Sequence, residues 1–216
     1  MYREDLRSLH YNSFMRNELI HQIQTYHPYN QQEQQDKEVI LQALMTDEHV
    51  FLRSDVKAHM TASAWVVNQS FDQILMAYHN LYDSWSWLGG HADGEEDLLS
   101  VSVREVKEES GACHVEPLST DIFSLEVLTV DGHEKNGSYI SSHLHLNITY
   151  LLMADDHEDL ICKPDENRAV SWFPIETAVS KSSEPWFREH IYSKLNDKLI
   201  RLIPDLKQKK NMEERV

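Results

Sequence analysis

The segment from residue 90 to residue 112 constrains this chain more than any other, because it spaces glycines and carboxylates at fixed intervals. Gly90 is followed after five residues by Glu96, and after seven more by the run Arg104-Glu105-Val106-Lys107-Glu108-Glu109-Ser110-Gly111. Carboxylates grouped this closely indicate either a solvated helix face or a site for a cation. The glycines and the arginine, in register around them, favour the site.

At 3.6 residues per turn, a helix from about residue 97 to residue 110 has two faces. One should carry an apolar stripe of Leu99, Val103 and Val106, and the opposite face should carry the glutamates. Their i, i+3, i+4 spacing makes them neighbours. Such carboxylates repel one another unless cations lie between them. All the donors are oxygens, so we expect Mg²⁺, with Mn²⁺ as a possible substitute.

The spacing resembles the Nudix box, the signature of a family of metal-dependent diphosphate hydrolases. Ala112 stands where the family usually has a larger aliphatic residue, and Leu88 where it often has proline. Both departures concern packing and loop stiffness, so they leave the chemistry in place.

The resemblance implies roles for the matching residues. Arg104 would orient a glutamate through an ion pair. The metals would be held by Glu105, Glu108 and Glu109 together with the carbonyl oxygen of Gly89. Glu96 would support the loop and the outer metal shell. Two glycines frame the box: Gly90 permits close backbone approach, and Gly111 ends the helix in a left-handed conformation.

A later acidic residue is the other candidate for catalysis. In the family, such a residue before a tryptophan-containing strand often acts as a metal ligand or as the catalytic base, and Glu166, ahead of Trp172, is the best match. The alternative is that Asp165-Glu166-Asn167 is only a polar turn.

Aromatic and histidine side chains are weaker candidates for contacts with a substrate. Trp85, Trp87 and His91 flank the glycine pair and could stack on a base or bond to it, although tryptophans are more often core. The alternation from residue 143 to residue 152 predicts a strand with His143 and His145 on one face. That pair could bind a transition metal, but a half-solvated sheet face explains it as well. We therefore interpret both as possible pocket residues and not as metal ligands.

Composition and net charge narrow the classes of protein to which this chain can belong. The chain has 216 residues, 41% of them hydrophobic, which is enough for one domain with an extension. A net charge of −16 argues against a general nucleic-acid surface. With that charge, a small phosphorylated substrate fits better than a polymer. The two cysteines do not form a disulfide framework, and no apolar run is long enough to span a bilayer, so we expect a cytoplasmic protein.

We expect three regions: a helical extension over 1–55, the hydrolase domain over 56–205 and a charged C-terminal tail over 206–216. The extension carries apolar residues at helical spacing and no catalytic constellation, so it should pack against the domain or form a homodimer, a substrate lid being the alternative. These residues are Leu6, Leu9, Phe14, Leu19, Ile20 and Ile23. A last helix over about 183–202 should bury Ile191, Leu195 and Leu199 and end at Pro204.

Strands on both sides of the box helix predict an α/β fold, a mixed sheet between helices, which is the α/β/α sandwich that the resemblance also implies. The expected activity is that of a Mg²⁺-dependent pyrophosphohydrolase acting on a nucleoside diphosphate linked to another group, or on a related phosphorylated metabolite. A Nudix-like regulator that senses a nucleotide without cleaving it is the alternative. A diphosphate isomerase is less favoured, because no cysteine lies near the glycine pair.

Overall fold

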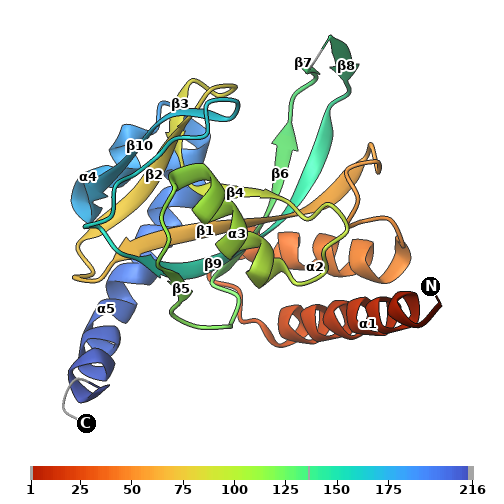
Figure 1. Cartoon of the computed structure of the whole chain (residues 1–216), viewed down its shortest axis with the longest axis horizontal. Coiled ribbons are helices and arrows are strands. Elements are labelled where there is room, and N and C mark those ends of the chain that lie inside the picture. Colours follow the sequence, from red (N-terminus) through yellow and green to blue (C-terminus); the bar gives the residue numbers. More distant parts are fainter. Residues whose placement is uncertain (1, 136, 214–216) are drawn as a thin grey trace. The chain divides into compact units, whose positions relative to one another are not determined.

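The computed structural model of the chain describes residues 2–135 and 137–213 (Figure 1). The first residue of the expected extension and the last three of the expected tail lie outside these ranges. Contacts between residues divide the chain into two compact units, and β1, β9 and α3 each have residues in both. Unit 1 comprises Met1–Ala64, Gly89–Glu105 and Ser119–Leu151, and unit 2 comprises Trp65–Leu88, Val106–Leu118 and Leu152–Val216.

The helices of unit 1 are those of the N-terminal region, α1 (Tyr2–Thr25) and α2 (Gln31–Thr46), which lie side by side (Figure 1). Asn30 caps α2, because its side chain accepts a hydrogen bond from the backbone N–H of Glu33 at 2.9 Å. The glutamine-rich residues 31–35 therefore form the first part of α2. Two helices in this region confirm the expected helical extension.

The strands of unit 1 continue from these helices. β9 (His143–Ala154) pairs with β6 (Ser124–Val130), antiparallel and in register over seven residues, and β1 (Ala58–Asn68) is another neighbour of β9 in the sheet. β4 (Leu88–His91) pairs with β1. A separate hairpin joins β7 (His133–Lys135) to β8 (Ser138–Ile140).

Helix α2 packs on β6 within unit 1. Ile40 and Leu44 of α2 are buried, as are Leu19 and Ile23 of α1, whereas Phe14 is exposed. The structure does not describe the side chains of Leu6 and Leu9. The extension thus packs against the strands of its own chain.

Unit 2 contains the end of β1, which pairs antiparallel with β2 (Gln73–His79). β2 also pairs with β10 (Asn167–Pro174) and with β3 (Ser84–Ser86). The short strand β5 (Val115–Pro117) pairs with the last residues of β9. Phe71 lies in the turn between β1 and β2 with a positive φ of 56°.

The helices of unit 2 are α4 (Ile175–Lys181), the π-helix η1 (Phe187–Tyr192) and α5 (Ser193–Glu213). Ile191, Leu195 and Leu199 are fully buried, which confirms the expected stripe. The expected end at Pro204 is wrong, since α5 continues through it to Glu213. Proline removes one backbone donor, but good helix formers on both sides keep the helix intact.

A mixed sheet with helices confirms the α/β class that the sequence predicted. In the parts of the chain that the structure describes, none of the helices has the length and apolar character that crossing a membrane requires.

Candidate active site

Helix α3 (Leu98–Ser110) carries the predicted carboxylates. Asp97 caps it, because Asp97 Oδ1 accepts a hydrogen bond from the backbone N–H of Ser100 at 3.1 Å, and Oδ2 accepts one from the Ser100 hydroxyl at 2.8 Å. At its other end the chain turns at Gly111, whose φ is 73°. Both ends lie within one residue of where the sequence placed them.

The buried face of α3 differs from the predicted one. Leu98, Val101 and Val106 are buried, whereas Leu99 and Val103 of the expected stripe are only partly so. Glu109 is 3% exposed and belongs to this buried side. The prediction that the glutamates lie opposite the buried stripe is therefore wrong. A carboxylate that is buried on a helix needs a partner of positive charge or hydrogen-bond donors.

In unit 1 the glycine pair lies against neighbouring groups with no room for a side chain. A Cβ on Gly90 would lie 2.6 Å from the carboxyl carbon of Glu105, and one on Gly89 would lie 2.4 Å from the carbonyl oxygen of Ala62. Arg104 Nη2 lies 3.0 Å from Glu105 Oε1, and the Glu105 side chain is 12% exposed. The arginine, the glycine backbone and the glutamate thus form one contact set, and Glu105 has little freedom to move.

In unit 2, Lys163 lies between two candidate carboxylates. Its Nζ is 3.3 Å from Glu108 Oε2 and 3.1 Å from Glu166 Oε1. Burial works against the charged amine, but hydrogen bonds to Glu166 and Glu108 raise the pKa of Lys163 above its usual range. Asn167, fully buried, donates from Nδ2 to the carbonyl oxygen of Glu109 at 3.0 Å. The turn at residues 165–167 is therefore tied to the C-terminal part of α3.

The first glutamate of the box, Glu96, lies in unit 1 with Arg16 of α1. Its Oε2 is buried without a hydrogen-bond partner among the described residues. Burial raises the pKa of Glu96, and the positive charge of Arg16 opposes that rise. Arg16 is itself held by a 2.8 Å hydrogen bond to the carbonyl oxygen of Asp47. The extension therefore supplies a charge to the loop before the box helix, which the sequence did not suggest.

The two candidate tryptophans take part in aromatic packing within unit 2. Trp85 meets Tyr78 and Phe173 edge to face, with ring centroids 5.4 Å and 4.7 Å away. Trp87 meets Phe187 and Tyr192 in the same manner, at 6.3 Å and 5.7 Å. Both are partly buried. Their contacts fit a packing role, and a role in substrate binding stays a prediction.

The three candidate histidines lie together in unit 1, with one that the sequence did not single out. His91 and His145 have ring centroids 4.9 Å apart, and His143 lies 5.1 Å from His145. His59 of β1 is within 5.1 Å of each of the other three. Burial, followed by the neighbouring imidazoles, lowers the pKa of His145 to about 2. His59 joins this group because β1 lies next to β9 in the sheet, an arrangement that the sequence alone does not predict.

The donor set of α3 fits a hard divalent cation. Glu105, Glu108 and Glu109 lie at i, i+3, i+4 on one helix, and carboxylate oxygens are the ligands that Mg²⁺ prefers. Limited exposure at Glu105 and Glu109 would concentrate their negative charge in a poorly solvated place, which a cation would relieve.

Comparisons with known proteins bear on the family. A family model described as NUDIX domain matches residues 57–195, more than half of the chain. No curated protein matches this chain in sequence.

The solved structures that are similar to this chain include three hydrolases. An Ap4A hydrolase of C. elegans, in a binary complex, is 17% identical, with 68% of this chain and 98% of that chain covered and a TM-score of 0.49. A NUDIX-family hydrolase of Clostridium perfringens is 21% identical, with 67% and 97% covered and a TM-score of 0.45. The E. coli dihydroneopterin triphosphate pyrophosphohydrolase is 14% identical, with 66% and 95% covered and a TM-score of 0.46. At these values the similarities carry no information on substrate.

Proposed function

Because this chain belongs to the NUDIX domain family, as the match over residues 57–195 shows, we propose that it is a Mg²⁺-dependent pyrophosphohydrolase. Membership makes it a hydrolase of phosphoric anhydrides with the fold of that family, an α/β/α sandwich with a mixed sheet. The proposed substrate is a nucleoside diphosphate linked to another group, or a related phosphorylated metabolite. The phosphoric anhydride between two phosphorus atoms is the bond to be cleaved.

The observation that carries this proposal is the complete set of box carboxylates on α3. Glu105, Glu108 and Glu109 are all present, and Arg104 pairs with Glu105 at 3.0 Å. A protein that only sensed a nucleotide would have no need of every carboxylate. The intact set therefore favours catalysis over the alternative of a non-catalytic regulator.

The residues proposed to hold the metal are Glu105, Glu108 and Glu109 with the carbonyl oxygen of Gly89, and Glu166 is proposed as a further ligand or as the catalytic base. When bound, Mg²⁺ would neutralise charge on the phosphate oxygens and lower the pKa of a bound water. Arg104 fixes the side chain of Glu105 by its ion pair. Gly90 leaves space for the Glu105 carboxylate, since any side chain there would collide with it.

Glu166 is the proposed general base for the attacking water. Its carboxylate is about one-third exposed and lies 3.1 Å from Lys163 Nζ, which also reaches Glu108. A carboxylate on a turn, with water access, can accept a proton more readily than a helix carboxylate bound directly to a metal. Lys163 would keep the Glu166 side chain oriented through this ion pair.

A phosphate-release screen tests the proposal. It would offer nucleotide sugars, dinucleoside polyphosphates, ADP-ribose and nucleoside triphosphates with Mg²⁺ and with Mn²⁺. We expect turnover that needs a divalent cation and that Glu109→Gln reduces by about 100-fold or more, in line with the loss of other electrostatic contacts to a transition state. Glu116→Gln, on an exposed position of β5, is the matched control and should leave turnover unchanged.

Two outcomes would contradict the proposal. Near-normal turnover in Glu109→Gln would place the chemistry away from the box. Tight binding of a nucleotide without hydrolysis, under every metal condition, would favour the regulator. A net charge of −16 favours a small substrate over a polymeric nucleic acid. A cytoplasmic location is part of the proposal.

A further inference from the structure

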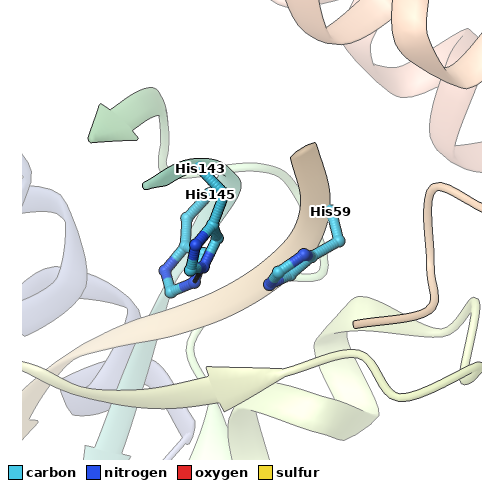
Figure 2. Close-up of side chains that lie close together, drawn as sticks. All are labelled: His59, His143 and His145. Atoms are coloured by element: carbon cyan, nitrogen blue, oxygen red, sulfur yellow. Dashed lines mark hydrogen bonds between the residues drawn. The ribbon is translucent and has the colours of Figure 1, made fainter. Parts of the chain in front are cut away.

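Three histidines of unit 1 bring one ring nitrogen each close together. His59 comes from β1, and His143 and His145 come from β9 on the same face of that strand. One ring nitrogen from each lies within 4.8 Å of the other two. Figure 2 shows the rings of His143 and His145 next to each other and the ring of His59 turned toward them.

Backbone carbonyls fix the tautomers of two of these rings. His59 Nδ1 lies 3.0 Å from the carbonyl oxygen of Asp55, and His143 Nδ1 lies 2.9 Å from that of Ser141. A carbonyl oxygen can only accept, so in each ring Nδ1 carries the proton and Nε2 has the free lone pair. Histidines that bind metals are usually oriented in this way, by a hydrogen bond from the nitrogen that does not bind.

The lone pair on Nε2 of His59 accepts no hydrogen bond from the residues that the structure describes. The residue is 4% exposed, and its Nε2 is buried without a hydrogen-bond partner among the described residues. A buried polar atom that is left unpaired costs about 1–3 kcal/mol. A cation bound at Nε2 would remove that cost.

The spacing of the other two nitrogens fits the same ligand. His143 Nε2 and His145 Nε2 are 3.3 Å apart. Two nitrogens on a tetrahedral zinc ion, each at about 2.0–2.1 Å from the metal, lie about 3.3–3.4 Å from each other. Imidazole nitrogens suit Zn²⁺, Cu²⁺, Ni²⁺ and Fe²⁺, whereas Mg²⁺ prefers oxygen.

We propose that His59, His143 and His145 form a binding site for a transition metal ion of the Zn²⁺ type, chemically distinct from the oxygen site of the box carboxylates. Three protein ligands leave a fourth tetrahedral position for water or another small ligand. The ion would join β1 to β9 next to β4, whose His91 ring borders the cluster.

One other group of possible ligands in the described residues is less suited. Asp155, Asp156 and His157 lie close together in a turn near the surface. Asp156 already accepts hydrogen bonds from Asn68 and Gln73. This group has no buried, unpartnered ligand atom comparable to His59 Nε2.

Co²⁺ titration of the full-length protein, followed by visible absorption, tests the site without any mutation. Four-coordinate Co²⁺ with nitrogen ligands absorbs strongly, and six-coordinate Co²⁺ with oxygen ligands absorbs weakly. We expect strong absorption that saturates at one equivalent per chain and is abolished by one equivalent of Zn²⁺. Only weak six-coordinate absorption would overturn the proposal.

Variants then assign the ligands. His143→Gln and His59→Gln should each weaken Co²⁺ binding by about 100-fold or more, because loss of an outer-shell partner alone commonly costs 10–100-fold. His49→Gln, at an exposed position of unit 1, is the matched control and should bind Co²⁺ as the wild type does. Glu109→Gln should also keep the strong absorption.

Circular dichroism of each variant shows whether it is folded. Should the buried His59→Gln variant fail to fold, the partly exposed His143→Gln and the titration of the unmodified protein still decide the matter. Unchanged affinity in a folded His143→Gln, or loss of the strong absorption in Glu109→Gln, would overturn the site.

Discussion

The hydroxyl of Ser124 on β6 lies 2.8 Å from Glu33 Oε1 on α2, and both residues are fully buried. Glu33 also accepts hydrogen bonds from the Tyr26 hydroxyl at 2.6 Å and from the backbone N–H of Tyr29 at 2.7 Å. Ser124 contacts Glu126, which is fully buried as well. The N-terminal region is thus joined to the strands of unit 1 by a buried polar network and not only by apolar contacts.

Replacing Glu33 should destabilise the protein more than an average surface change. Glu33→Ala would remove the acceptor of the Tyr26 hydroxyl, the Tyr29 N–H and the Ser124 hydroxyl, and each of these hydrogen bonds contributes about 1 kcal/mol. We expect a loss of about 3 kcal/mol or more in the free energy of unfolding, measured by urea denaturation. Glu38→Ala, at an exposed position of the same helix, should cost less than about 1 kcal/mol. Equal losses in the two variants would show that the network adds no stability.

Deleting residues 1–46 should destabilise the strands of unit 1, against which α2 packs. The deletion would expose the strand surface that Ile40 and Leu44 cover, and it would remove Glu33 from Ser124. We expect a chain that is insoluble or partly unfolded, judged by sedimentation and circular dichroism. A soluble, folded product with unchanged metal dependence would show that the region is dispensable.

The box helix and the extension show what the sequence could predict. The C-terminal end of α3 followed from Gly111 as a terminator, which is a local signal. The cap that Asp97 provides at the other end comes from the structure. The buried face did not follow, because Glu109 lies where a pattern of apolar residues would place a hydrophobic side chain. Such departures from the pattern are expected at functional sites, where chemistry is kept at some cost in stability.

Contacts between segments that are far apart along the chain could not be predicted from the sequence. Glu33 and Ser124 are separated by 91 positions, and His59 lies far from His143, so no local pattern links them. The strand carrying His143 and His145 was predicted, yet its pairing with β1 was not, and residues on both of its faces are buried along most of its length. Without that pairing, a half-solvated face was the natural interpretation of the two histidines.

Gly90→Ala should disturb Glu105 through a direct collision. The added Cβ would lie 2.6 Å from the carboxyl carbon, so the glutamate must move away from its pair with Arg104. We expect kcat to fall by about 10-fold or more, because active-site groups displaced by about 1 Å lose much of their effect. The same change made in a Glu105→Ala background should cost less stability than in the wild type. Additive losses of stability in this double-mutant cycle would argue against the collision.

Stability should fall in mild acid because of the histidine cluster. Burial, together with His91, His59 and His143 and the charge of Arg53, lowers the pKa of His145 to about 2. Burial also lowers the pKa of His59. The unfolded chain takes up protons near the ordinary pKa of 6.5, and the folded chain does not, so the folded state loses stability as the pH falls from about 6.5 toward 2.

Urea denaturation at several pH values, in the presence of a chelator, measures this effect. The unfolding equilibrium constant should rise by up to about tenfold per pH unit for each such histidine, and it should be insensitive to these groups above pH 6.5. His145→Gln should flatten the dependence. A dependence unchanged in that variant would assign the acid sensitivity to other groups.

The last prediction separates a base from a ligand at Glu166, which lies 3.1 Å from Lys163 Nζ. If Glu166 takes the proton from the attacking water, Glu166→Gln should reduce kcat by about 100-fold or more and flatten the acidic limb of the pH–rate profile. The Mg²⁺ concentration for half-maximal activity should change little, since the carboxylates of α3 remain. Asp165→Asn, the exposed neighbour, is the matched control and should leave both quantities unchanged. A collapse of Mg²⁺ affinity in Glu166→Gln would show that Glu166 is chiefly a ligand. If neither quantity changed, residues 165–167 would be a polar turn whose role is to anchor Asn167 to α3.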